Sequence, residues 1–158
     1  MNDILFWMET STLGRLMQES TWLFPTAEIF HFIGLSLLMG SLLVVDFRLL
    51  GFSRDVPVEA VYKFLPITVI GFSINLVTGI LFCFSDPFRY YPNIAFRLKI
   101  LLVLLAGVNA LYFAITAHAN STSVGTEDSE RKLKIVAALS LMFWIGVIIC
   151  GRLIPYVE

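Results

Sequence analysis

The most constraining feature of this sequence is a set of four apolar stretches, each long enough to cross a lipid bilayer as a helix. They cover about residues 25–50, 61–85, 94–118 and 132–154. A helix needs roughly 20 mainly apolar residues to cross the hydrocarbon core. Only short loops remain between the stretches. We therefore predict an all-α protein with a single membrane domain over residues 1–158, built as a four-transmembrane-helix bundle.

The N-terminal segment, residues 2–20, is too polar to cross the membrane. Apolar positions alternate there with charged ones, which is typical of a short amphipathic helix lying in the membrane interface. We expect one or two such helices, with a break near residues 10–12. Trp7 and Trp22 support this placement, because tryptophan favours the headgroup level. The first apolar patch is too short for a cleavable signal peptide, and no basic segment precedes it.

Composition limits the classes of partner and reaction. Hydrophobic residues make up 58% of the chain and charged residues 15%, with a net charge of -1. This charge offers no basic surface for nucleic acid. The chain has no phosphate-binding loop, nucleophile elbow, HExxH or CxxC motif. We expect the lipid bilayer as its environment, homo-oligomers or other membrane subunits as partners, and no enzymatic activity by the chain alone.

Four spans place both termini on the same side of the membrane, called side A here; the opposite face is side B. Basic residues divide almost evenly between them, so the positive-inside rule gives little direction. Those toward side A are Arg15, Arg89, Arg97, Lys99 and Arg152; those toward side B are Arg48, Arg54, Lys63, Arg131, Lys132 and Lys134. The most polar loop, residues 120–131, favours side B as cytoplasmic, with the termini in the periplasm.

Small residues recur at spacings of four in three of the spans. Such residues let membrane helices approach closely, so we expect them at helix contacts. They are Ser36 and Gly40, then Gly71 and Gly79 with Asn75 between them in the same stripe, then Ala106, Ala110 and Ala114.

Two amides lie near mid-membrane at similar depth, Asn75 in the second span and Asn109 in the third. A polar amide in hydrocarbon needs a hydrogen-bond partner. We predict that both face the bundle interior and bond to each other, or to Ser36, Ser41 or Thr78, as packing contacts.

The clearest candidate site combines ionisable residues near side A, since such residues inside spans are costly and often functional. Glu28 and His31 are three residues apart and share a helix face. Lys99 and Arg152 enter from two other spans at similar depth. One interpretation is structural: Glu28 pairs with a cation and His31 is a buried hydrogen-bonding residue. The other is a cofactor site, with His31 holding haem b iron or with His31, Lys99 and Arg152 binding a quinone or small anion.

A haem held by two histidines within one chain conflicts with the spacing. The second histidine, His118, lies at the side B end of the third span, about 25 Å from His31 by helix rise. Haem would then need five-coordinate iron, another ligand type, or a ligand from a neighbouring chain.

Two further groups invite weaker hypotheses. Cys83 and Cys150 both lie near side A and with His31 are candidates for a copper(I) site, although cysteines in spans commonly act as small apolar residues. Near side B, Asp46 is expected to face inward and pair with Lys63 or Lys132.

Several motifs follow one another along the chain: Trp22-Leu23-Phe24-Pro25 with Glu28, His31-Phe32-Ile33-Gly34, Asp46 through Gly51, Asn93 through Lys99, and Gly151-Arg152. Their order resembles an uncharacterised bacterial family of four-helix membrane proteins, a domain of unknown function. There is also a loose likeness to CopD-like copper-resistance proteins and to cytochrome b-like bundles. The first resemblance implies a bacterial inner-membrane protein and points to Glu28, His31, Asp46, Arg48, Lys99 and Arg152, but it implies no activity.

These observations favour a cofactor-binding subunit, for haem b or a quinone, or an accessory subunit of a membrane redox system. Two alternatives stay open: a structural membrane protein without cofactor that forms oligomers, and a transporter for copper or a small solute.

Overall fold

The computed structural model describes residues 2–52, 57, 63–120 and 127–157, with side chains in these ranges except for 116–120 and 127–129. The described chain is helical and contains no strand. The helices are α1 (Asn2–Thr10), α2 (Thr12–Glu19), α3 (Leu23–Leu50), α5 (Leu65–Ser85), α6 (Pro87–Tyr90), α7 (Ile94–Asn120) and α8 (Glu127–Leu153).

Four of these helices, α3, α5, α7 and α8, are long and apolar enough to cross a membrane. Most of the large apolar side chains on them point outward rather than into the bundle. Such surfaces suit a lipid environment, where outward apolar side chains replace contact with water by contact with acyl chains. The protein is therefore a multi-pass membrane protein, and the predicted four-helix membrane fold is confirmed.

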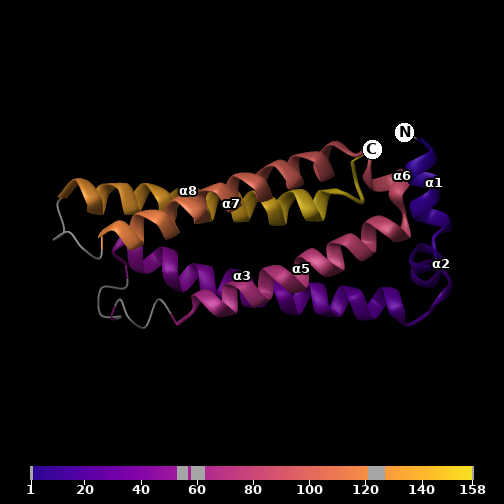
Figure 1. The fold of residues 1–158 in the computed structure, drawn as a ribbon, viewed down its shortest axis with the longest axis horizontal. Coiled ribbons are helices and arrows are strands. Elements are labelled where there is room, and N and C mark those ends of the chain that lie inside the picture. Colours follow the sequence, from indigo (N-terminus) through magenta and orange to yellow (C-terminus); the bar gives the residue numbers. More distant parts are fainter. Residues whose placement is uncertain (1, 53–56, 58–62, 121–126, 158) are drawn as a thin grey trace.

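The four spans form two pairs, α3 with α5 and α7 with α8, and α3 also packs on α8. Figure 1 shows the pairs running side by side, with both ends of the chain at the same end of the bundle. Leu38, Ala106, Trp144 and Val147 form a buried apolar cluster between the pairs. The Phe72 ring joins it by meeting Trp144 edge-on, with centroids 6.2 Å apart.

The N-terminal segment forms the two short helices that the sequence predicts, and they lie across the side A end of the bundle (Figure 1). The Ser11 hydroxyl accepts a hydrogen bond from the Gly14 N–H and so caps α2. This cap satisfies a donor that the first helical turn leaves free. Met17 is buried where α2 packs on α5.

The start of the second span and the end of the first can be compared with the predicted bounds. Residues 61 and 62, where the second span was expected to begin, lie outside the described residues. Helix α5 begins at Leu65, and Pro66 occupies its first turn, where its missing N–H costs no hydrogen bond. Helix α3 ends at Leu50, and the following Gly51 has a φ of 94°, the left-handed conformation typical of the residue that closes a helix.

Helices α3 and α5 touch through their backbones at Gly34 and Gly71. A Cβ on Gly71 would lie 2.6 Å from the Leu38 nitrogen and 2.7 Å from the Gly34 oxygen. By contrast, a Cβ on Gly40 or Gly79 would meet nothing within 4 Å. The expected contact role of Gly71 is confirmed. Gly40 and Gly79 were wrongly assigned to helix contacts, because a regular spacing of four drifts away from the interface.

The two mid-membrane amides each face a neighbouring helix, as predicted, but they bond neither to each other nor to Ser36, Ser41 or Thr78, so the predicted partners are wrong. The Asn75 amide donates to the Gly71 carbonyl of its own helix at 2.9 Å. The Asn109 amide donates across the α7–α8 pair to the Val136 carbonyl at 3.0 Å. Both side chains are half-buried. They lie at similar depth but on helices that belong to different pairs.

Asn93 holds the end of the chain against the start of α7, a role that its place in the sequence did not reveal. Its side-chain oxygen accepts the Phe96 N–H at 3.1 Å. Its amide donates to the carbonyls of Ile154, at 3.0 Å, and of Val157. The side chain is buried, so the segment after α8 is fixed on the side A end of the bundle.

We predict that Gly34→Ala and Gly71→Ala each lower the free energy of unfolding by about 1–3 kcal/mol, because a Cβ must push the two backbones apart. Unfolding in mixed detergent, followed by circular dichroism, measures this change. Gly40→Ala and Gly79→Ala are the matched controls and should leave stability unchanged or slightly raised. Equal losses in all four variants would contradict the assigned contact.

Candidate functional site

His31 lies on the face of α3 that meets α5. The buried positions of α3 include Ala27, Gly34, Leu38 and Ser41. His31 continues this series, because steps of three and four residues keep one helix face toward a partner. The imidazole is half-buried. The backbone contact of the two helices, one turn away at Gly34, thus brings His31 against α5.

The tautomer of His31 follows from its hydrogen bond to Thr78. His31 Nδ1 lies 2.7 Å from the Thr78 hydroxyl oxygen. That hydroxyl has one hydrogen, and the carbonyls of Ile74, at 2.7 Å, and of Asn75, at 3.3 Å, lie within its reach on its own helix. We infer that the hydroxyl donates to its own helix and accepts from His31 Nδ1–H. In a neutral imidazole only one nitrogen carries a hydrogen, so a protonated Nδ1 leaves Nε2 with a free lone pair that can accept a hydrogen bond.

Aromatic rings border the imidazole on the side A part of α5. The Phe82 ring lies 5.3 Å from the His31 ring, centroid to centroid. Phe24 packs on the same Phe82 ring at 5.4 Å. These two rings restrict the orientation of the imidazole. They also give the site an apolar wall, beside the polar contact between His31 and Thr78.

Lys99 of α7 belongs to the same cluster. It lies near enough to His31, Cys83 and Cys150 to interact with them electrostatically. Its ammonium nitrogen would be 3.4 Å from a Cβ on Gly151, so the side chain runs across α8 at that glycine. The side chain is half-buried, and within the described part of the chain no carboxylate forms a salt bridge with it. The structure therefore brings His31 and Lys99 together.

Glu28 and Arg152, the other two expected site residues, have exposed side chains. Arg152 stacks over the Tyr156 ring, with 5.4 Å between its guanidinium carbon and the ring centroid. An ion pair between Glu28 and a buried cation, one of the two interpretations of the sequence, is not formed with any described residue. The rotation of each helix about its axis, which depth does not reveal, explains this difference.

Glu28 instead lies near Tyr90 of α6, outside the spans. Burial raises the pKa of the Tyr90 phenol above its usual value, and Cys83 and the carboxylates of Asp86 and Glu28 raise it further, against a partial offset by Arg89. Tyr90 is therefore a neutral hydrogen-bond donor at neutral pH, at the side A boundary of the His31 cluster.

The two cysteines are free thiols, Cys83 half-buried and Cys150 buried. Among the described residues, no group of three or more His, Cys, Asp or Glu side chains is arranged to hold a metal ion. The proposed copper site of His31, Cys83 and Cys150 thus lacks a compact donor set. His118 lies in α7, but its side chain is outside the described residues.

Near side B, Asp46 faces inward, as the sequence predicts, but it does not form the expected pair with Lys63 or Lys132. The Ser140 hydroxyl of α8 faces its carboxyl group as a hydrogen-bond donor. The side chain is 4% exposed, and its Oδ2 atom has no hydrogen-bond partner. Asp46 therefore lies apart from the His31 cluster, at the opposite end of the bundle.

The sequence interpretation missed the main partner of His31. From the sequence, Thr78 was expected only as one of several hydrogen-bond partners for Asn75 and Asn109. A usable signal was present, because Thr78 is seven residues beyond Gly71 and so shares its face of α5. A close glycine contact followed two turns later by a hydroxyl indicates which position on α5 can meet α3.

Comparison with known proteins gives one match. The model of a family of unknown function, DUF6644, matches residues 4–157. No curated protein and no solved structure shows a significant match. The comparisons therefore support the resemblance to an uncharacterised family and lend nothing to the likeness to CopD-like or cytochrome b-like proteins.

We predict that Thr78→Val removes the acceptor of His31 Nδ1–H and releases the imidazole from its single tautomer. Leaving a buried donor unpaired costs about 1–3 kcal/mol of stability. Nitrogen-15 NMR of histidine-labelled protein measures the tautomer directly, with His118→Gln used to assign the His31 signals. Thr26→Val, an isosteric change at an exposed position of α3, is the control. An unaltered His31 spectrum in Thr78→Val would show that Thr78 does not set the tautomer.

Proposed function

Because the chain belongs to a family of unknown function, DUF6644, we propose its role from its own residues: a membrane subunit that binds a quinone headgroup at His31 and Lys99. One observation carries this proposal: His31, hydrogen-bonded through Nδ1 to Thr78, lies close to an ammonium that has no carboxylate partner among the described residues. A quinone is membrane-soluble, and its ring oxygens both accept and, when reduced, donate hydrogen bonds.

The two side chains complement a reduced quinone in different ways. His31 Nε2 accepts the hydrogen bond of one quinol hydroxyl, with the ring held in place by Thr78. Lys99 donates to an oxygen and stabilises negative charge on it, an effect that is strong where water is scarce. Phe82, whose ring lies beside the His31 imidazole, offers an aromatic face to the quinone ring. Binding is the function of this chain, and the electrons pass to or from another subunit of a membrane redox system.

Haem b is a second candidate, supported by the same histidine. Histidines that ligate metals usually donate their other ring N–H to a fixed acceptor, which is the role of Thr78 here. Lys99 would pair with a haem propionate. The iron would be five-coordinate or would take its sixth ligand from a neighbouring chain, because His118 lies at the far end of α7.

We also propose the bacterial inner membrane as the location, with side B in the cytoplasm and the termini in the periplasm. The polar loop at side B supports this orientation. The structural class without cofactor and the copper or solute transporter remain alternatives to the redox role, and binding measurements separate them.

The deciding experiment is equilibrium binding of decylubiquinone, oxidised and reduced, to the purified protein in nanodiscs. We expect His31→Ala to weaken quinol binding at least tenfold and Lys99→Met to weaken both forms. Arg97→Met is the matched control, because Arg97 is two residues from Lys99 on α7 but exposed and stacked on Tyr91. Equal binding by all variants would exclude this site.

A reduced-minus-oxidised visible spectrum of the same preparations, with haem supplied during expression, tests the second candidate. A Soret band that His31→Ala abolishes would assign haem to His31. No quinone binding together with no Soret band would leave the structural role, with His31 and Thr78 as an internal hydrogen-bonded contact.

A further inference from the structure

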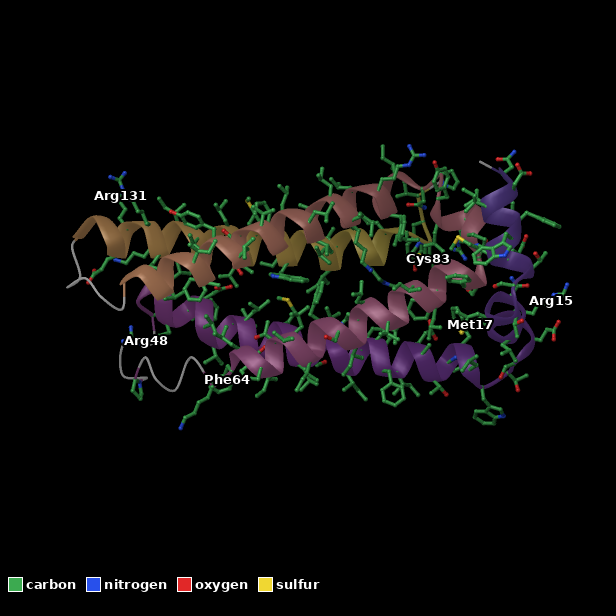
Figure 2. All side chains as sticks on the ribbon, in the orientation of Figure 1. Arg15, Met17, Arg48, Phe64, Cys83 and Arg131 are labelled. Carbon is green, nitrogen blue, oxygen red and sulfur yellow. The ribbon has the colours of Figure 1, made fainter. Side chains whose placement is uncertain are left out.

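A second polar site lies near side B, within a cavity of about 570 Å³ to which all four spans contribute. In Figure 2, the labels Arg48 and Phe64 mark this end of the bundle, and Met17 and Cys83 mark the other. Asp46 is fifteen residues beyond His31, which corresponds to about 22 Å along α3. This cavity is therefore separate from the quinone site proposed above.

The walls of the cavity are mainly apolar, with few polar side chains. The polar ones are Asp46, Thr68, Asn109 and Ser140. A pocket of this size with apolar walls and a few polar groups is typical of sites for small organic molecules. Water alone is poorly suited to such a cavity, because each buried water needs two to four polar partners.

Two of these polar groups are already engaged within the protein. The Thr68 hydroxyl lies 2.7 Å from the Ser41 hydroxyl and also reaches the carbonyl of Phe64. The Asn109 amide donates to the Val136 carbonyl. Neither contact serves Asp46, so they form the wall around it rather than a partner for it.

Asp46 is the exception in this otherwise satisfied wall. Its side chain is 4% exposed and lines the cavity, and its Oδ2 atom is fully buried without a hydrogen-bond partner among the described residues. An ionised carboxylate only accepts hydrogen bonds, and leaving one of its oxygens unpaired in a low-dielectric interior is costly. A hydrogen-bond donor removes this cost, and a positively charged donor also balances the charge of the ionised carboxylate.

We propose that this cavity binds an amphiphilic ammonium group, with N–H donating to the Asp46 carboxylate and an apolar body filling the space between α3, α5 and α7. Asp46 is four residues from the end of α3 at Leu50, about 6 Å along the axis. That depth is reachable both from the headgroup region and from the aqueous side. The ammonium comes from an aminolipid headgroup or from a free amine.

The test uses benzylammonium as the probe, with benzyl alcohol as the uncharged analogue, and the full chain in nanodiscs of phosphatidylcholine, whose quaternary nitrogen has no N–H. Isothermal titration calorimetry measures the affinity. We expect saturable binding of benzylammonium, at least tenfold tighter than of benzyl alcohol. Equal affinity for the two probes, or no saturable binding, would overturn the proposal.

Two variants locate the binding. Asp46→Asn should weaken benzylammonium binding at least tenfold and leave the protein folded by circular dichroism, because an amide is less costly to bury than a carboxylate. Ala110→Leu, which keeps the carboxyl group but narrows the cavity, should weaken both probes. Glu28→Gln, at an exposed carboxyl on the side A end of α3, is the control and should bind as wild type. Unchanged affinity in Asp46→Asn or in Ala110→Leu would refute the assigned site.

Adding phosphatidylethanolamine to the nanodiscs separates the two sources. Competition with benzylammonium in the wild type, lost in Asp46→Asn, would identify a lipid headgroup as the ligand. Undiminished benzylammonium binding in these nanodiscs would identify a free amine. Either result supports the ammonium site.

Discussion

The backbone contact between Gly34 and Gly71 sets the distance on which the polar chemistry of the bundle depends. Side chains as short as threonine and serine can bridge two helices only where the backbones nearly touch. On the side A part of this contact, His31 reaches Thr78; on the side B part, Ser41 reaches Thr68. Each bond crosses from α3 to α5 at 2.7 Å. Without the glycines, both hydroxyls would be out of reach.

The apolar cluster of Leu38, Ala106, Trp144 and Val147 divides the interior into two parts. Along α3, Leu38 lies between His31 and Asp46. Along α8, Val147 and Trp144 lie between the side A cluster and Ser140. A buried apolar layer offers no ligands to an ion, so this arrangement favours two separate binding sites over a continuous path across the membrane.

The fold was predictable from the sequence because length and apolarity alone define a membrane span. The helix faces were harder to predict. Spans that contact lipid are apolar all round, so the alternation that shows the inward face of a soluble helix is absent. Gly40 and Gly79 were chosen by spacing and proved to face open space. Asn75 and Asn109 were paired by depth, although their helices belong to different pairs.

In the candidate site, too, the sequence does not indicate which face of each helix points inward. Depth placed Glu28, His31, Lys99 and Arg152 together near side A, and only the rotation of each helix separates them into buried and exposed residues. Glu28 and Lys99 each lie five residues from the start of their helices, at Leu23 and Ile94. Glu28 nevertheless faces outward, where headgroups and water can solvate it, while Lys99 is half-buried.

That difference decides which charges need a partner. A charge near a membrane boundary can reach the interface along its own side chain, so exposed Glu28 and Arg152 require nothing from the bundle. Lys99 and Asp46 face inward at opposite ends. Among the described residues no carboxylate pairs with Lys99, and Asp46 has a donor in Ser140 but one carboxyl oxygen without a partner. The apolar cluster keeps the two charges apart. Because neither can neutralise the other, each is open to a ligand from outside the chain. This is the common basis of the two proposals above, a quinone at His31 and Lys99 and an ammonium group at Asp46.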